Sequence, residues 1–253
     1  MADRLVEIAD GFWNIRGSFK IAGLIDIGTQ ASLIRLASGG FALLDAYALQ
    51  GEVAREVMER TDQGRGIEAI LNLHPFHTVH VRAIAQQLPG ARLYGTVRHV
   101  ARAPELRWEA LHTEDEALHE LFAEDLAFTV PRGVDFVSDN EKLHFSSVLA
   151  LHRASRTLHV DDTLTWVGLP LVGGLSFHPT LRSVLQPRPG AVAEFRAWAG
   201  ELITLCEGVE QLCTAHTRSL PPPSSAGVSA AERVQRALQR VGKVLDAHER
   251  RFG

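Results

Sequence analysis

Three histidines, His74, His77 and His80, fall within seven residues, directly after an apolar run at residues 67–73 that is typical of a buried strand. A histidine cluster at the end of a strand predicts imidazoles at the carboxyl edge of a sheet, where ligands and metals bind in α/β folds. Neutral imidazole is the commonest protein metal ligand. A metal site also needs converging partners from elsewhere in the chain, and the candidates are His144, Asp162 and His216.

Each of these partners lies at a predicted strand end. His144 precedes a strand at residues 147–152, and a short polar turn returns the chain as a second strand that ends in Asp161 and Asp162. His216 ends a final strand that begins at Val209. Either aspartate could face the histidines, because one residue of strand register is not fixed by sequence.

The histidine loop itself lies in a strand–helix–strand unit. Residues 81–88 have helical spacing, Pro89 and Gly90 end that helix, and residues 91–95 form the next strand. This order predicts a right-handed crossover that places the histidines at one edge of a parallel pair.

A hairpin precedes this unit. Residues 31–37 and 40–45 flank the turn at Ser38 and Gly39, and the second strand ends in Asp45. From its position alone, Asp45 is interpreted as an N-cap or turn residue.

In this order, the histidine block, the lone histidine, the aspartate and the last histidine resemble the metallo-β-lactamase superfamily. That family carries His-x-His-x-Asp-His after a strand, and the resemblance covers most of the chain apart from about its last thirty residues. With one residue inserted after His74, His77 and His80 match the second and third family histidines, and Val79 stands at the position of the motif aspartate. The resemblance implies an α/β fold, a four-layer αββα sandwich with two facing sheets and outer helices.

The resemblance also implies a ligand set. In the family, two metals share a bridging aspartate and a water whose pKa falls from ~15.7 toward ~7. Mapped here, His74, His77 and His144 would hold the first metal, His80 and His216 the second, and Asp162 would bridge. Asp162 and His80 are the residues to which catalytic roles are assigned. For Asp45 the resemblance implies a different role, the support of the histidine loop by hydrogen bonding.

Val79 removes a ligand from the second metal position, so one metal per chain is expected. The donor set suits Zn²⁺, with Fe or Mn as alternatives. The resemblance implies a weakened metal-dependent hydrolase acting on an ester, thioester, lactam or phosphodiester. The alternative is an inactive member that binds a small ligand or partner in the old pocket. Neither a Gly-x-Ser-x-Gly elbow nor a nucleotide-binding glycine motif occurs.

The composition narrows the choice of partner. A formal charge of −4 argues against nucleic acid, and no apolar run approaches the ~20 residues of a membrane span. The beginning of the chain lacks the order of a signal peptide, so a cytoplasmic protein with a small-molecule substrate is expected. Cys206 and Cys213 are expected to be buried, reduced thiols.

Three segments are predicted in the domain organisation. Residues 1–220 form the metallo-β-lactamase-like domain, 221–228 a Pro/Ser-rich tether, and 229–253 a last helix with one apolar stripe. That stripe packs on its own domain or on a second copy, so monomer and homodimer both remain open. Residues 104–122 are expected to be helical, and residues 168–189 are expected to form a long loop.

Overall fold

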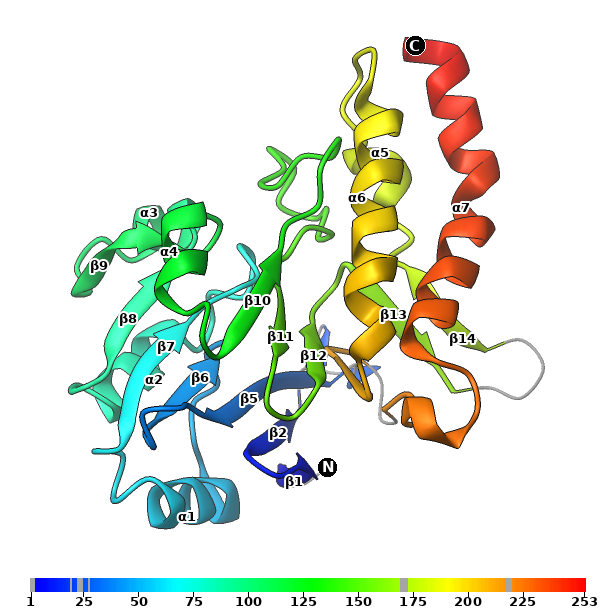
Figure 1. Ribbon diagram of the computed structural model, residues 1–253. Coiled ribbons are helices and arrows are strands. Elements are labelled where there is room, and N and C mark those ends of the chain that lie inside the picture. The colour runs from blue at the N-terminus through cyan, green and yellow to red at the C-terminus, as the bar shows by residue number, and fades with distance from the viewer. Residues whose placement is uncertain (1–2, 19, 22–24, 27, 169–172, 217–219) are drawn as a thin grey trace.

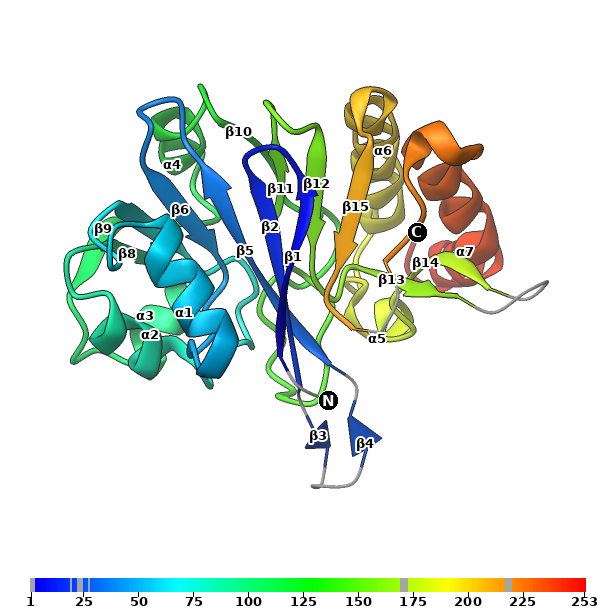
Figure 2. The same ribbon diagram turned by 90° about the horizontal axis from the view of Figure 1, so that it is seen from below.

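The structure is a computed structural model that describes residues 3–18, 20–21, 25–26, 28–168, 173–216 and 220–253. Two sheets face each other in the middle of the molecule, and helices cover both outer faces (Figures 1 and 2). The predicted four-layer αββα sandwich is therefore confirmed. Residues 19–21 are also a short strand candidate in the sequence, and Phe19 lies outside the described residues.

The larger sheet has the strand order β1-β2-β5-β6-β7-β8-β9. Its first four strands are antiparallel neighbours, and β6, β7, β8 and β9 run parallel to one another. The strands are β1 (Arg4–Ala9), β2 (Phe12–Gly17), β5 (Thr29–Arg35), β6 (Phe41–Leu44), β7 (Ile67–Leu71), β8 (Arg92–Gly95) and β9 (Trp108–His112). Two short strands, β3 (Lys20–Ile21) and β4 (Ile25–Asp26), form a small hairpin between β2 and β5.

The smaller sheet has the order β10-β11-β12-β15, in which β12 and β15 are parallel and the other neighbours are antiparallel. Its strands are β10 (Leu126–Thr129), β11 (Leu149–His152), β12 (Thr157–Val160) and β15 (Gln211–Thr214). A separate hairpin of β13 (Leu164–Val167) and β14 (Gly174–Phe177) follows β12.

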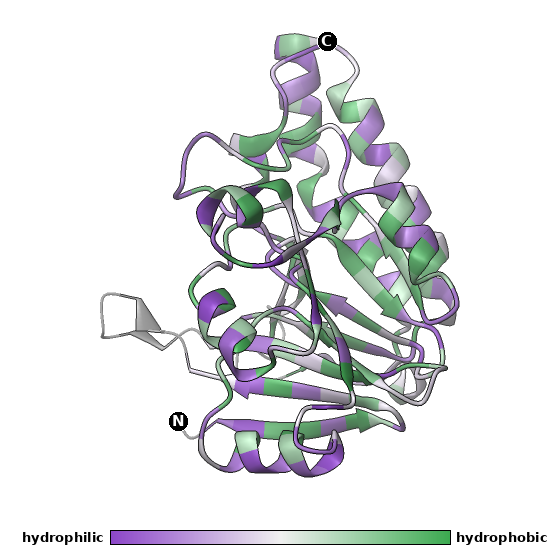
Figure 3. Ribbon diagram, turned by 90° about the vertical axis from the view of Figure 1, so that its left-hand side faces the viewer, coloured by the Kyte–Doolittle hydropathy of each residue, from purple (hydrophilic) through white to green (hydrophobic). Residues whose placement is uncertain are grey.

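The helices form the two outer layers. They are α1 (Gly51–Arg60), α2 (Val81–Gln87), α3 (Val97–Arg102), α4 (Glu116–Leu121), α5 (Leu181–Val184), α6 (Ala191–Leu205) and α7 (Ala230–Phe252). One hydrophobic cluster joins α1 and α2 to the larger sheet, a second fills the space between the sheets, and a third joins the smaller sheet to α6 and α7. Figure 3 shows hydrophobic and hydrophilic residues along both α6 and α7, as expected of helices with one buried face.

Two predicted segments were wrong. Residues 104–122 contain β9 and the short α4, not one helix, because Trp108–His112 pairs with β8 and that tertiary pairing overrides local helical spacing. Within residues 168–189, β14 and α5 replace the expected continuous loop. Both cysteines are buried and free, as expected. No helix among the described residues combines the length and apolar character needed to cross a membrane.

The apolar stripe of α7 packs on its own chain. Ser229 caps the helix by accepting a hydrogen bond from the Glu232 amide, as its capping-box sequence predicts. Val234, Ala237 and Leu245 are fully buried in the cluster that also contains Trp198 of α6. This stripe is therefore occupied within one molecule.

Replacing Leu245 by alanine is expected to lower the free energy of unfolding by about 2 to 5 kcal/mol, because the fully buried side chain leaves a cavity between α7 and α6. Gln239→Ala, at an exposed position of the same helix, is the control and should change stability by less than ~0.5 kcal/mol. Urea unfolding of both variants measures the difference. An equal, small effect would show that α7 does not contribute to this core.

Candidate metal centre

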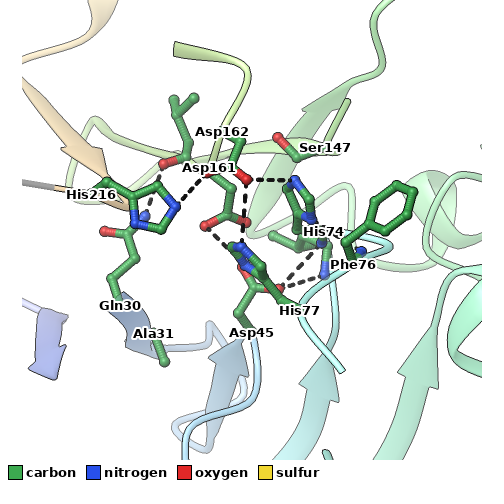
Figure 4. Close-up of polar contacts among 12 residues, drawn as sticks. Gln30, Ala31, Asp45, His74, Phe76, His77, Ser147, Asp161, Asp162 and His216 are labelled. Carbon is green, nitrogen blue, oxygen red and sulfur yellow. Dashed lines mark hydrogen bonds and ion pairs between the residues drawn. The ribbon is translucent and has the colours of Figure 1, made fainter. Parts of the chain in front are cut away.

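The polar residues at one edge of the two sheets come from strand ends. They follow the carboxyl ends of two pairs of parallel strands, β6 with β7 and β12 with β15, and these ends meet at the same edge. The segment before β11 reaches that edge too, because β11 is antiparallel to β12. The residues brought together in this way are Asp45, His74, His77, His144, Asp161, Asp162 and His216. Figure 4 shows six of them, Asp45, His74, His77, Asp161, Asp162 and His216, at this edge.

Asp162 is the centre of this cluster. Its Oδ1 lies 2.6 Å from Nε2 of His216. Its Oδ2 lies 3.2 Å from Nε2 of His74, 3.7 Å from Nε2 of His77 and 3.7 Å from Nδ1 of His144. The structure thus brings four of the predicted histidines to Asp162 rather than to Asp161.

Burial and charge set the protonation of this cluster. Burial acts to raise the pKa of Asp162, but the surrounding imidazoles outweigh it and hold that pKa well below its usual range. Burial acts to lower the pKa of His77, but Asp162 and Asp161 overcome it and raise the pKa to about 9. Burial also acts to lower the pKa of His216, but Asp162 overcomes it and raises that pKa. Without a metal, protons on these imidazoles balance the carboxylate.

His74 is held differently. It is fully buried, and burial together with the charge of His77 lowers its pKa to about 4. The main-chain N–H of Phe76 donates to its Nδ1 over 3.1 Å, which turns Nε2 toward Asp162. Because Nδ1 accepts this bond, Nε2 carries the proton of the neutral ring. For a neutral His74 to bind a metal through Nε2, that proton would have to move to Nδ1, and the bond from Phe76 would be lost.

A second buried cluster lies directly behind the first. Asp45, which has a φ of +63°, accepts hydrogen bonds at Oδ1 from the amides of Leu73 and His74, over 2.8 and 3.3 Å. Its Oδ2 lies 2.9 Å from Nε2 of His159. Asp45 therefore supports the histidine loop by hydrogen bonding, as the resemblance implies. Nδ1 of His159 bonds to Oγ of Ser32 over 2.9 Å.

His80 does not reach the cluster, so its predicted metal and catalytic roles lack support in the geometry. It stands at the N-terminal end of α2, and its ring lies against that of Tyr47 with 4.9 Å between centroids. His80, like His144 and His216, is not in the group formed by His74, His77 and Asp162, whose ligand atoms lie within 4.8 Å of one another. Unlike His144 and His216, it has no ion pair with Asp162 among the described residues.

Val79 lies on the surface, with 70% of the residue exposed. An aspartate there would point toward solvent, so Val79→Asp is expected to leave metal content unchanged and to alter stability by less than ~0.5 kcal/mol. Metal analysis and urea unfolding of the variant test this expectation. A gain of metal relative to the wild type would show that position 79 faces the site after all.

Phe76 and His144 form the rim of the site. Their rings stack with 4.8 Å between centroids, and the guanidinium of Arg98 lies over the other face of Phe76 at 4.4 Å. Nε2 of His144 bonds to the carbonyl of Glu141, which leaves Nδ1 facing Asp162. The aromatic residue inserted in the motif thus supports an imidazole of the site.

The donor set fits a divalent metal. His74, His77 and Asp162 offer ligand atoms that all lie within 4.8 Å of one another. Nε2 of His74 is buried without a hydrogen-bond partner among the described residues, although it faces Oδ2 of Asp162 at 3.2 Å. Such atoms are costly to leave unsatisfied, and coordination would satisfy them.

Sequence reasoning missed His159. The signal was an imidazole in the middle of an otherwise apolar strand, two residues before a pair of aspartates. Every residue of β12 is buried, so a polar side chain there needs partners inside the molecule. Ser32 and Asp45 come from distant segments, and their proximity follows only from the packing of one sheet on the other.

Comparisons with solved structures support the fold. The metallo-β-lactamase of Erythrobacter litoralis matches with a TM-score of 0.61 and 12% identity, over 94% of this chain and 96% of that one. FIM-1 of Pseudomonas aeruginosa, in its mono-zinc form, matches with a TM-score of 0.60 and 11% identity, over 95% and 96%. A metallo-β-lactamase of Pontibacter korlensis gives 0.58 and 12%, over 94% and 99%. No protein-family model and no curated protein sequence matches the chain.

The chain therefore has the metallo-β-lactamase fold. The likeness covers nearly all of this chain and of each similar structure, at a level of identity that establishes architecture alone.

Proposed function

We propose that this chain is a metal-dependent hydrolase with a single metal, most readily Zn²⁺, in the cluster around Asp162. The observation that carries the proposal is the convergence of four imidazoles on one buried carboxylate. His74, His77, His144, His216 and Asp162 would hold the metal. Val79 lies on the surface, and the ring of His80 packs against Tyr47. Both observations favour one metal over two.

A bound divalent metal supplies Lewis-acid chemistry, polarising a carbonyl or phosphoryl oxygen and acidifying water. The chain's own residues do the rest. Asp162 fixes the imidazoles around itself and would supply a carboxylate ligand to the metal. His144, whose side chain is 39% exposed, is the member of the cluster most accessible to a substrate.

The substrate class is the small-molecule ester, thioester, lactam or phosphodiester. One experiment tests the proposal: protein loaded with Zn²⁺, Fe²⁺ or Mn²⁺ is assayed against a panel of these four bond types, beside chelator-treated protein. The proposal expects hydrolysis of at least one bond type, lost with the chelator and restored by metal. Metal binding without hydrolysis of any of the four would overturn the hydrolase assignment.

A specific contact favours the alternative, an inactive protein that binds a ligand in this pocket. His216 and Asp162 approach to 2.6 Å, and the carbonyl of Gly28 accepts from Nδ1 of the same ring. This imidazole and carboxylate therefore satisfy each other directly when both ring nitrogens are protonated. Metal content separates the two functions, because the alternative needs no metal.

A further inference from the structure

We propose that Asp161 is a positioning residue of the metal site, whose carboxylate accepts a hydrogen bond from Nδ1 of His77 and so directs Nε2 of that ring toward the metal. The proposal rests on the proposed function for the metal itself. Asp161 itself belongs neither to the histidine motif nor to the proposed ligand set. Asp161 lies beside Asp162 in the chain, yet it faces the second cluster.

Asp161 is buried, and its nearest charged nitrogens lie beyond hydrogen-bond distance. It is 1% exposed, and neither of its carboxylate oxygens has a hydrogen-bond partner among the described residues. An unsatisfied buried carboxylate is strongly unfavourable, so a nearby donor is required. Two nitrogens lie close to its Oδ1, Nε2 of His159 at 3.8 Å and Nδ1 of His77 at 3.9 Å.

His77 is the donor that remains available. Both ring nitrogens of His159 already have partners, Oγ of Ser32 and Oδ2 of Asp45, each at 2.9 Å. Nδ1 of His77 contacts only Asp161 within the described part of the chain. A separation of 3.9 Å exceeds a hydrogen bond, and contacts of this kind tighten when a site is loaded.

The ring of His77 is fixed between two carboxylates. Its Nε2 faces Oδ2 of Asp162 at 3.7 Å, on the side where the metal ligands converge. It stacks on His74 with 4.0 Å between centroids and 18° between planes, which sets the orientation of the ring. A histidine that binds a metal through one nitrogen commonly donates its other N–H to a carboxylate, and that donor–acceptor pair fixes the tautomer.

Asp45, His159 and Asp161 could also be considered as a second metal site, because their ligand atoms lie within 4.8 Å of one another. The hydrogen bonds argue against it. Asp45 already accepts from the amides of Leu73 and His74, and both nitrogens of His159 are engaged. A metal would have to break these bonds in a closed interior. We therefore assign the cluster to the support of His74 and His77.

The test is Asp161→Asn, with Asp161→Ser as a second, smaller variant in case the first does not fold. Asp125→Asn is the matched control, because Asp125 accepts a backbone hydrogen bond at the opposite edge of the smaller sheet. Two quantities are measured: the zinc dissociation constant by competition with a chromophoric chelator, and the ¹⁵N chemical shifts of the His77 ring, which report which nitrogen carries the proton.

Both Asp161 variants are expected to bind zinc about 10- to 100-fold more weakly, at an unchanged maximal stoichiometry, while the control binds like the wild type. The His77 shifts should move toward a mixture of tautomers. Unchanged shifts and affinity would overturn the proposal, and so would the loss of one of two metal equivalents, which would reveal a second metal site. If the wild type binds no metal, the proposed function fails, and the His77 shifts of metal-free protein, recorded above about pH 9 where the ring is neutral, still decide the role of Asp161.

Discussion

Asp162→Ala is expected to weaken metal binding by at least about 100-fold, and Asp161→Ala by less, within the 10- to 100-fold range typical of residues that orient ligands. The reason is geometric. The oxygens of Asp162 face four imidazoles, whereas Asp161 faces only His77 among the metal ligands. Removing Asp162 leaves imidazoles that repel one another and a metal without its only carboxylate ligand. Chelator competition measures both dissociation constants.

Asp162→Asn controls for folding in this comparison. It keeps the shape of the side chain but loses the charge, so it should fold like the wild type and still lose most of the metal affinity. Circular dichroism and urea unfolding verify the fold of each variant. A larger loss for Asp161→Ala than for Asp162→Ala would show that the strand register places the neighbouring carboxylate at the metal.

Zinc affinity is expected to rise steeply with pH, by at least about 100-fold between pH 6.5 and 8.5. The pKa of His77 is raised to about 9, so its ring holds a proton over this range, and Nε2 must lose its proton to bind metal. One released proton gives about a tenfold change per pH unit. His216, whose pKa is also raised by Asp162, adds to the slope. Competition titrations at several pH values measure it.

The stability of chelator-treated protein should change in the opposite direction. Asp162 and Asp161 raise the pKa of His77, and Asp161 and Asp45 raise that of His159, in each case against burial and to about 9. A raised pKa in the folded state contributes stability that is fully present below about pH 6.5 and is lost as pH rises through about 9. Urea unfolding should therefore show falling stability over the range in which zinc affinity rises. Zinc affinity independent of pH would mean that neither His77 nor His216 exchanges a proton for metal.

The fold was largely predictable because local sequence patterns indicate most of its helices and strands. The apolar run before His74 became β7, and the spacing of residues 81–88 became α2. The prediction of one helix over residues 104–122 was wrong because a segment such as Trp108–His112 suits a helix or a strand equally well. Pairing with β8 makes this segment a strand. Sequence spacing does not contain that information.

The site was predictable in its residues more than in its geometry. His74, His77, His144, Asp162 and His216 meet because each lies at a strand end on one edge of the sandwich. The ring of His80 packs against Tyr47, and a helix begins one residue later, so the position of this side chain depends on a turn that sequence spacing does not fix. The second buried cluster, formed by Asp45, His159 and Asp161, depends on contacts between the two sheets. No local sequence pattern encodes such contacts.

The central claim, a single metal held around Asp162, is tested most directly by the metal content of protein purified without chelator or histidine tag and then dialysed. Plasma mass spectrometry should find about one divalent metal per chain in the wild type, chiefly zinc. A folded wild type that retains almost no metal, even after incubation with zinc, iron or manganese, would contradict the account. It would show that the imidazoles around Asp162 serve as proton-bearing partners of a carboxylate and not as metal ligands.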